Sequence, residues 1–94
     1  MDFECHITVK ASDAKIAQEA ADNFGWKTSE IARDPLLGDA TFFYCTRHSS
    51  NYIDLFHWMC FLTNRLQEFG VAVLRQKIEL IMLDTKKSGV INVS

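Results

Sequence analysis

Residues 3–10, Phe-Glu-Cys-His-Ile-Thr-Val-Lys, decide the fold class of this chain. Apolar and polar side chains alternate along the whole stretch, which is the period of a β-strand with one buried and one exposed face. The buried set consists of the odd-numbered residues Phe3, Cys5, Ile7 and Val9. The even-numbered residues then lie on the opposite face of the sheet, which we call the open face because we expect no helix to cover it.

Two helices and three more strands follow this first strand. We expect one helix over 13–24, capped by Ser12 and ended by Gly25, and a longer one over 51–69, capped by Ser50 or Asn51 and ended by Gly70. The further strands are expected at 26–32, 41–47 and 71–83, with a turn at 33–39 around the only proline.

The resulting element order, βαββαβ, predicts a ferredoxin-like α+β fold. Its four-stranded antiparallel sheet carries both helices on one face, and the first and third strands are central neighbours. The length of 94 residues indicates one domain over 1–94. Within it, residues 84–94 are expected to form a loose tail with a candidate edge strand at 90–93.

Composition excludes some classes of function. Lys and Arg number 10 against 12 Asp and Glu, a balance that argues against non-specific nucleic-acid binding. The three cysteines, Cys5, Cys45 and Cys60, show no paired spacing, which is typical of thiols in a reducing compartment. No basic-then-apolar run follows Met1, and no apolar stretch is long enough to span a membrane. We therefore expect a cytoplasmic protein without membrane contact.

The open face is the first candidate site. The first strand offers Glu4, His6, Thr8 and Lys10 to it, and the last strand offers Arg75, Lys77 and Glu79. The third strand presents either Phe42, Tyr44 and Thr46 or Phe43, Cys45 and Arg47, and the first set is favoured because Cys45 suits a core.

This face has two interpretations. In the first, it binds a small anionic ligand such as a nucleotide: Arg75 and Lys77 supply charge, His6 and Thr8 donate hydrogen bonds, and Tyr44 stacks. In the second, it is an ordinary polar surface whose charges pair across strands, Glu4 with Lys77 and His6 with Glu79.

The long helix carries the second candidate site. Its predicted core stripe contains Tyr52, Leu55, Phe56, Met59, Leu62 and Leu66, and its polar stripe contains Asp54, His57, Asn64, Arg65 and Glu68. Phe61 falls within the polar stripe, and Trp58 falls at its border near Arg65. Exposed aromatic residues beside an arginine indicate an interface with a second copy or a partner protein. The alternative is that the region around Asp39 or the tail covers them.

Two short motifs bear a resemblance to a known family. His6-Ile7-Thr8 and His48-Ser49-Ser50 resemble the two H-x-[ST] motifs of the 2H phosphoesterases, in which two histidines act as acid and base on a phosphodiester. That resemblance implies His6 and Thr8 as catalytic residues at a dimer interface. Whether His48 and Ser50 join them is open from the sequence.

Two further stretches, His6–Val9 and Arg75–Glu79 before Leu83-Asp84, carry a second resemblance. On these residues the whole chain resembles small bacterial and phage proteins with no established activity. This resemblance implies the same fold and a bacterial or viral origin.

We expect no cofactor and no metal site, because His57, Cys60 and His48 do not make a closed set of four ligands. The leading prediction is a non-catalytic, homo-oligomeric binding module for a small anionic ligand or a partner protein. The alternatives are a 2H-like phosphodiesterase and a protein inhibitor or adaptor that acts through Trp58 and Phe61.

Overall fold

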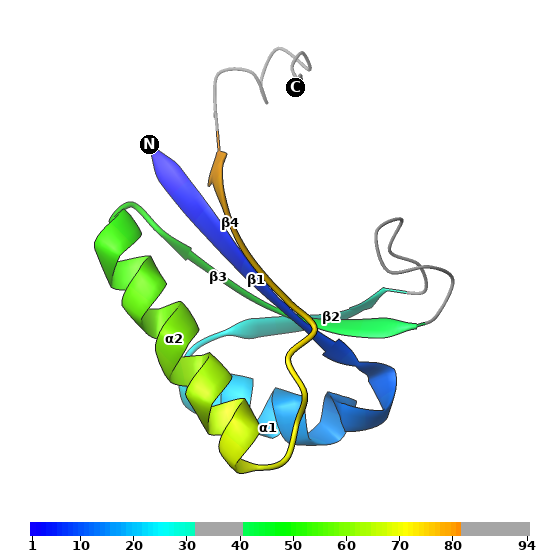
Figure 1. The fold of residues 1–94 in the computed structure, drawn as a ribbon. Helices are drawn as coiled ribbons and strands as arrows, with labels where there is room; N and C mark the ends of the chain where they lie inside the picture. The colour runs from blue at the N-terminus through cyan, green and yellow to red at the C-terminus, as the bar shows by residue number, and fades with distance from the viewer. Residues whose placement is uncertain (32–40, 82–94) are drawn as a thin grey trace.

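A computed structural model describes residues 1–31 and 41–81 of the chain (Figure 1). It has an α+β fold with a four-stranded antiparallel sheet and two α-helices, as the sequence predicted. The elements are β1 (Asp2–Lys10), the 3-10 turn η1 (Ala11–Asp13), α1 (Ala14–Asn23), β2 (Lys27–Ile31), β3 (Phe42–Ser49), α2 (Tyr52–Glu68) and β4 (Arg75–Ile81).

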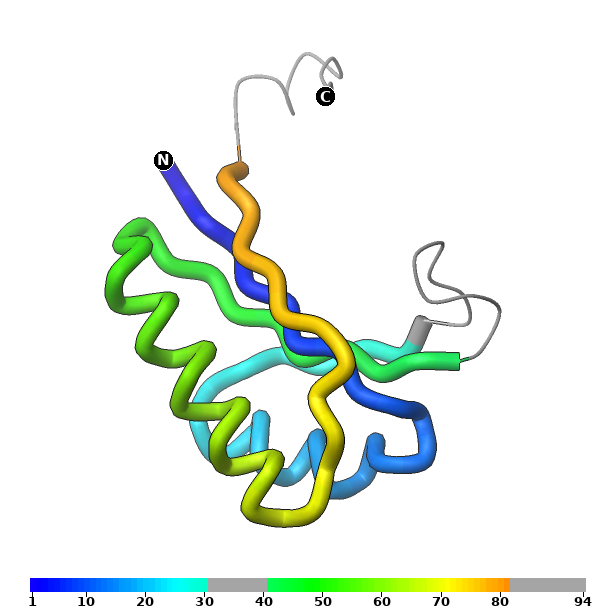
Figure 2. Tube along the Cα trace, viewed as in Figure 1, coloured from blue at the N-terminus to red at the C-terminus, as the bar shows by residue number. Residues whose placement is uncertain are grey.

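The sheet has the strand order β2-β3-β1-β4. β1 and β3 are neighbours in its centre, as predicted, and their pairing runs from Phe3↔Ser49 to Lys10↔Phe42. β4 pairs with the other side of β1, so the first and last strands lie side by side along their length (Figure 2). The even-numbered residues of β1 therefore have direct partners on both sides.

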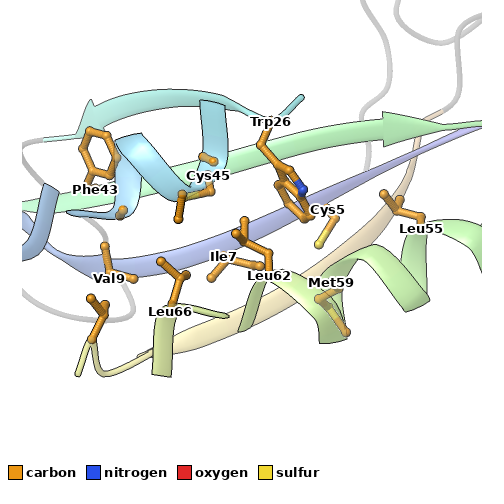
Figure 3. Packing of buried hydrophobic residues seen from close by; sticks show 14 residues of the cluster. Cys5, Ile7, Val9, Trp26, Phe43, Cys45, Leu55, Met59, Leu62 and Leu66 are labelled. Atoms are coloured by element: carbon orange, nitrogen blue, oxygen red, sulfur yellow. The ribbon is translucent and has the colours of Figure 1, made fainter. Parts of the chain in front are cut away.

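The core lies between the sheet and both helices (Figure 3). Cys5, Ile7 and Val9 point into it from β1. This confirms the prediction that the odd-numbered residues of the first strand face the core. α1 contributes only alanines to this cluster, so its backbone can approach the sheet closely. The remaining members come mainly from α2 and β3: Leu55, Met59, Leu62, Leu66, Phe43 and Cys45.

Both helices end in the same way, at a glycine with positive φ. Gly25 has φ 79° and Gly70 has φ 81°, the left-handed region that favours glycine. The residue after each glycine donates its backbone N–H back to the helix, Trp26 to Ala21 at 3.0 Å and Val71 to Leu66 at 2.9 Å. Trp26 and Val71 are buried, so each helix end also closes the core.

Several predicted boundaries were wrong by a few residues. Ser12 lies in η1, and Asp13 precedes α1 without a side-chain capping bond. Trp26 belongs to the turn before β2, because its backbone N–H donates to the Ala21 carbonyl of α1. At α2 the predicted cap is confirmed, since Asn51 Oδ1 accepts from the Asp54 N–H at 3.0 Å.

The third strand is longer than predicted and the last is shorter. β3 continues to Ser49 because β1 supplies partners as far as Phe3. β4 begins only at Arg75, where its pairing with Thr8 starts. The predicted turn at 33–39, the end of the last strand beyond Ile81, and the tail with its edge strand lie outside the described residues.

The core stripe of α2 is narrower than predicted. Leu55, Met59, Leu62 and Leu66 fill it, whereas Tyr52 is 45% and Phe56 41% exposed. These two rings lie at the flank of the stripe and stack on each other instead, with centroids 6.4 Å apart. The interpretation of Tyr52 and Phe56 as core residues was therefore wrong.

Candidate functional site

The sheet register arranges the open face in rows. Directly opposed residues point to the same side of an antiparallel sheet, so each row crosses the strands. The Thr8 row contains Ser29, Tyr44, Thr8 and Arg75, and the His6 row contains Lys27, Thr46, His6 and Lys77. The Glu4 row contains His48, Glu4 and Glu79. No helix within residues 1–31 and 41–81 packs on these rows, since both helices pack on the other face.

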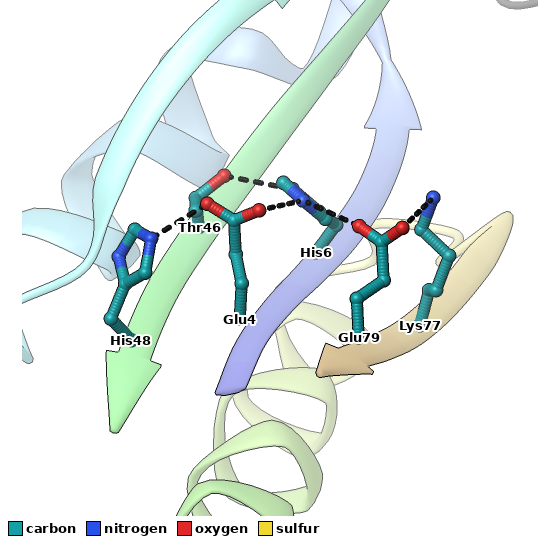
Figure 4. Close-up of polar contacts among 6 residues, drawn as sticks. All are labelled: Glu4, His6, Thr46, His48, Lys77 and Glu79. Atoms are coloured by element: carbon teal, nitrogen blue, oxygen red, sulfur yellow. Dashed lines mark hydrogen bonds and ion pairs between the residues drawn. The ribbon is translucent and has the colours of Figure 1, made fainter. Parts of the chain in front are cut away.

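One carboxylate connects the two histidines of this face (Figure 4). Glu4 Oε1 lies 3.0 Å from His6 Nε2, and Glu4 Oε2 lies 2.7 Å from His48 Nε2. The His6 and Glu4 side chains are partly buried, whereas that of His48 is half exposed. Glu4 thus holds both imidazoles at neighbouring positions of one surface.

His6 is the centre of a wider polar network. Its Nδ1 lies 3.1 Å from Thr46 Oγ1, and its Nε2 lies 3.5 Å from Glu79 Oε1 as well as facing Glu4. Glu79 Oε2 in turn lies 3.5 Å from Lys77 Nζ. Both ring nitrogens of His6 are therefore engaged, which fixes the orientation of the imidazole.

The cross-strand pairs expected from the sequence are only partly present. His6 does contact Glu79, but Glu4 contacts the two histidines and Lys77 contacts Glu79. The register explains this, because Glu4 lies opposite both Glu79 and His48, while Lys77 lies opposite His6.

All five residues predicted to bind a ligand lie in the Thr8 and His6 rows. The His6 and Tyr44 rings meet edge to face with centroids 6.1 Å apart, and Arg75 and Lys77 follow one another on the same face of β4. Thr8 differs from the expectation of a freely accessible donor, since it is only 2% exposed. The prediction that Phe42, Tyr44 and Thr46 lie on the open face of the third strand is correct, since they pair with Lys10, Thr8 and His6. Phe42 is nevertheless buried.

Sequence reasoning missed the parts played by Glu4, His48 and Thr46. The predicted strand over 41–47 ends before His48, whereas β3 continues to Ser49 and includes it. The length of the first strand could have indicated this. Because β1 begins before Glu4, an antiparallel β3 that pairs with it along its whole length has to include His48.

A hollow of about 440 Å³ opens beside His48 at the β2 side of the sheet. Three basic side chains line it, together with Phe24, Gly25 and Thr46: Lys27, Arg47 and His48. Lys27 and Thr46 also belong to the His6 row, so the hollow continues into the open face. The Arg47 guanidinium also donates to the Phe24 carbonyl, and His48 contacts Glu4, so the hollow is suited to an anion chiefly through Lys27 and Thr46.

The buried cysteines take no part in the site. Cys5 and Cys45 are fully buried on the helix side of the sheet, and this burial raises the pKa of each thiol to about 12. Both thiols are therefore protonated at neutral pH, and neither acts as a nucleophile with His6.

The aromatic residues of α2 form a second cluster on the helix side of the sheet, together with Phe24, which also lines the hollow beside His48. Phe61, 41% exposed, meets Phe24 at 4.8 Å and Trp58 at 5.7 Å between ring centroids. Trp58 is less exposed than its predicted border position implied, because the Arg47 guanidinium covers its ring at 4.1 Å. Arg65 lies 5.7 Å from the Phe24 ring.

The comparisons with protein-family models, curated proteins and solved structures found no match to this chain. Among the described residues, no helix has the length and apolar character needed to cross a membrane.

Proposed function

We propose that the chain is a non-catalytic binding module whose open face holds a small phosphate-bearing anion, such as a nucleotide. The observation that carries this proposal is the His6 row, in which an ammonium, a hydroxyl, an imidazole and a second ammonium cross all four strands: Lys27, Thr46, His6 and Lys77. Such groups neutralise and hydrogen-bond phosphate oxygens.

The dimensions of the row support a ligand larger than one phosphate. Neighbouring strands are about 4.8 Å apart, so the backbones of Lys27 and Lys77 are separated by about 14 Å. The Thr8 row adds Arg75 for charge and the Tyr44 ring for stacking. The two rows are two residues apart along the strands, about 6.8 Å, so a phosphate over the His6 row and its base over Tyr44 fit this separation.

The charges favour the same placement. The carboxylates of Glu4 and Glu79 lie at one edge of the His6 row, and each already contacts an imidazole. Arg75 and Lys27 lie in the other two rows, and so does Lys77, which pairs with Glu79 at 3.5 Å. The anion therefore lies over the His6 and Thr8 rows and away from the Glu4 row.

We expect the double variant His6→Ala with Lys77→Ala to bind AMP at least about 10-fold more weakly. The charge-assisted hydrogen bond of Lys77 contributes about 1.5–3 kcal/mol, and about 1.4 kcal/mol is tenfold in affinity. The loss of His6 also removes the group that contacts Glu4, Glu79 and Thr46 beneath the ligand. Isothermal calorimetry at fixed ionic strength measures the change. Lys15→Ala, an exposed lysine on α1, is the matched charge control. If the double variant keeps the affinity of the native protein, the site assignment is wrong.

A second candidate function is a phosphodiesterase in which His6 and His48 act as acid and base. Its support is the shared carboxylate, since Glu4 lies 3.0 Å from one imidazole and 2.7 Å from the other within one chain. Two copies of the His6 motif at a dimer interface are then not required. Thr8 would contribute little, because it is buried.

Turnover of a 2′,3′-cyclic nucleotide distinguishes this candidate from the binding module. A bell-shaped pH profile, lost in both His6→Ala and His48→Ala, is the expected result for the enzyme. Binding of the same compound without turnover supports the binding module and contradicts the phosphodiesterase.

The proposal includes a homo-oligomer that forms through α2, with capture of a partner protein as its alternative. Its support is the set of exposed apolar side chains along this helix, among them Ile53, which is 62% exposed, and Phe61, which is 41% exposed. We expect Phe61→Asp to shift the protein to a monomer in sedimentation velocity, with Asn64→Asp as the control on the same helix. A native protein that sediments as a monomer contradicts the oligomer.

We also infer a ferredoxin-like arrangement, a cytoplasmic location and a bacterial or phage origin. The central β1–β3 pair and the two helices on one face support the first, and the free, buried Cys5 and Cys45 support the second. The origin rests on the resemblance carried by His6–Val9 and Arg75–Glu79.

A further inference from the structure

We propose that Glu4, His6 and Glu79 form a binding site for a divalent first-row transition metal ion, with Zn²⁺ as the representative ion. One ligand atom from each residue lies within 4.8 Å of the other two. The three side chains come from two neighbouring strands, and their rows are adjacent on the open face. This site does not depend on the proposed anion site, although His6 belongs to both.

The separations between the ligand atoms fit a tetrahedral ion. Zinc bonds of about 2.0–2.1 Å to nitrogen and oxygen place neighbouring ligand atoms about 3.3–3.4 Å apart. His6 Nε2 lies 3.0 Å from Glu4 Oε1 and 3.5 Å from Glu79 Oε1. The third separation, between the Glu4 and Glu79 oxygens, is within 4.8 Å. The two carboxylates therefore have to approach each other by up to about 1.5 Å to enclose the ion.

Two further residues hold the ligands in place. Thr46 Oγ1 lies 3.1 Å from His6 Nδ1, so it can accept the Nδ1–H and leave Nε2 as the ligand atom. His48 Nε2 lies 2.7 Å from Glu4 Oε2, the oxygen that does not face His6. Hydrogen bonds of this kind to the distal atoms of metal ligands orient the ligands and raise their basicity.

The donor set indicates the class of ion. One imidazole with two carboxylates is a nitrogen and oxygen set, which suits zinc and its neighbours better than it suits copper(I) or an iron–sulfur cluster. Cys5 and Cys45 point to the other side of the sheet and supply no sulfur. The two carboxylates offset the charge of the ion, and the competing Lys77 ammonium is partly exposed and lies 3.5 Å from Glu79.

The test is calorimetric titration of the full chain with Zn²⁺ alone, in the native protein and in matched variants. We expect one site, with affinity lowered in Glu79→Gln and His6→Asn by more than the ~10–100-fold that loss of an outer-shell partner costs, and lowered in Thr46→Val by about that amount. Glu68→Gln, an exposed glutamate on α2, is the control and should not change the affinity.

Lys77→Ala separates the metal site from the anion site. It should weaken AMP binding but retain Zn²⁺ binding, whereas Glu79→Gln should weaken Zn²⁺ binding and retain AMP binding. Because Glu79 is half exposed near the end of an edge strand, its replacement should leave the fold intact.

Two results would overturn the metal site. One is an unchanged Zn²⁺ affinity in both Glu79→Gln and His6→Asn. The other is a thiolate-to-metal charge-transfer band in the Co²⁺-loaded protein that disappears in Cys60→Ser, which would place the ion at Cys60 and His57 on α2.

Discussion

Leu62→Ala is expected to lower the free energy of unfolding by about 2–5 kcal/mol. Leu62 is fully buried in the middle of the α2 stripe that faces β1. Its truncation removes apolar contacts and leaves a cavity that the surrounding side chains fill only in part. For a domain of this size, with a total stability of about 5–14 kcal/mol, this is a large fraction.

Urea denaturation followed by circular dichroism measures the loss. Leu80→Ala is the matched control, because Leu80 on β4 is 47% exposed and should cost less than about 1 kcal/mol. Equal losses in the two variants would contradict the placement of the core between α2 and the sheet.

Arg47→Met is expected to destabilise the fold by about 2–5 kcal/mol, through the loss of one charged hydrogen bond and one cation–π contact. The Arg47 Nη1 donates to the Phe24 carbonyl at 2.7 Å, which ties the end of β3 to the last turn of α1. The same guanidinium lies 4.1 Å from the centre of the Trp58 ring, a contact that adds about 0.5–2 kcal/mol. One side chain thus joins β3, α1 and α2.

Arg47→Lys should recover only part of this stability, because an ammonium cannot hydrogen-bond to Phe24 and lie flat on the indole at once. Arg65→Met is the control, since Arg65 is half exposed and pairs with Glu68 at 3.6 Å within the same helix. If Arg47→Met and Arg65→Met lose the same stability in thermal denaturation, Arg47 does not join the three elements.

The parity of β1 could be predicted from the sequence, because period-two alternation over eight residues allows one buried face only. The two glycines that end the helices could also be predicted, since left-handed caps favour glycine. These local signals placed His6 on the open face together with Lys77 and Arg75.

The partners of His6 could not be predicted in the same way. Whether Glu4 contacts Lys77 or the two histidines depends on the register of three strands. In addition, the predicted third strand ended two residues too early, which left His48 off the open face. The burial of Thr8 and Phe42 depends likewise on neighbours that are distant in sequence.

The width of the buried stripe on α2 was a further limit. Helical periodicity gives the direction of the buried face, but the number of rows that reach the sheet depends on how the helix crosses it. Tyr52 and Phe56 have the right periodicity and still lie outside the contact.

The most direct test of the open face as the binding surface is an ¹H–¹⁵N correlation spectrum recorded during titration with AMP. We predict saturable shifts at the amides of the His6 and Thr8 rows, above all at His6, Thr46 and Lys77, and none at Asn64 or Glu68 on the exposed side of α2. Saturable shifts confined to α2, or no saturable shift on the sheet, would contradict the account.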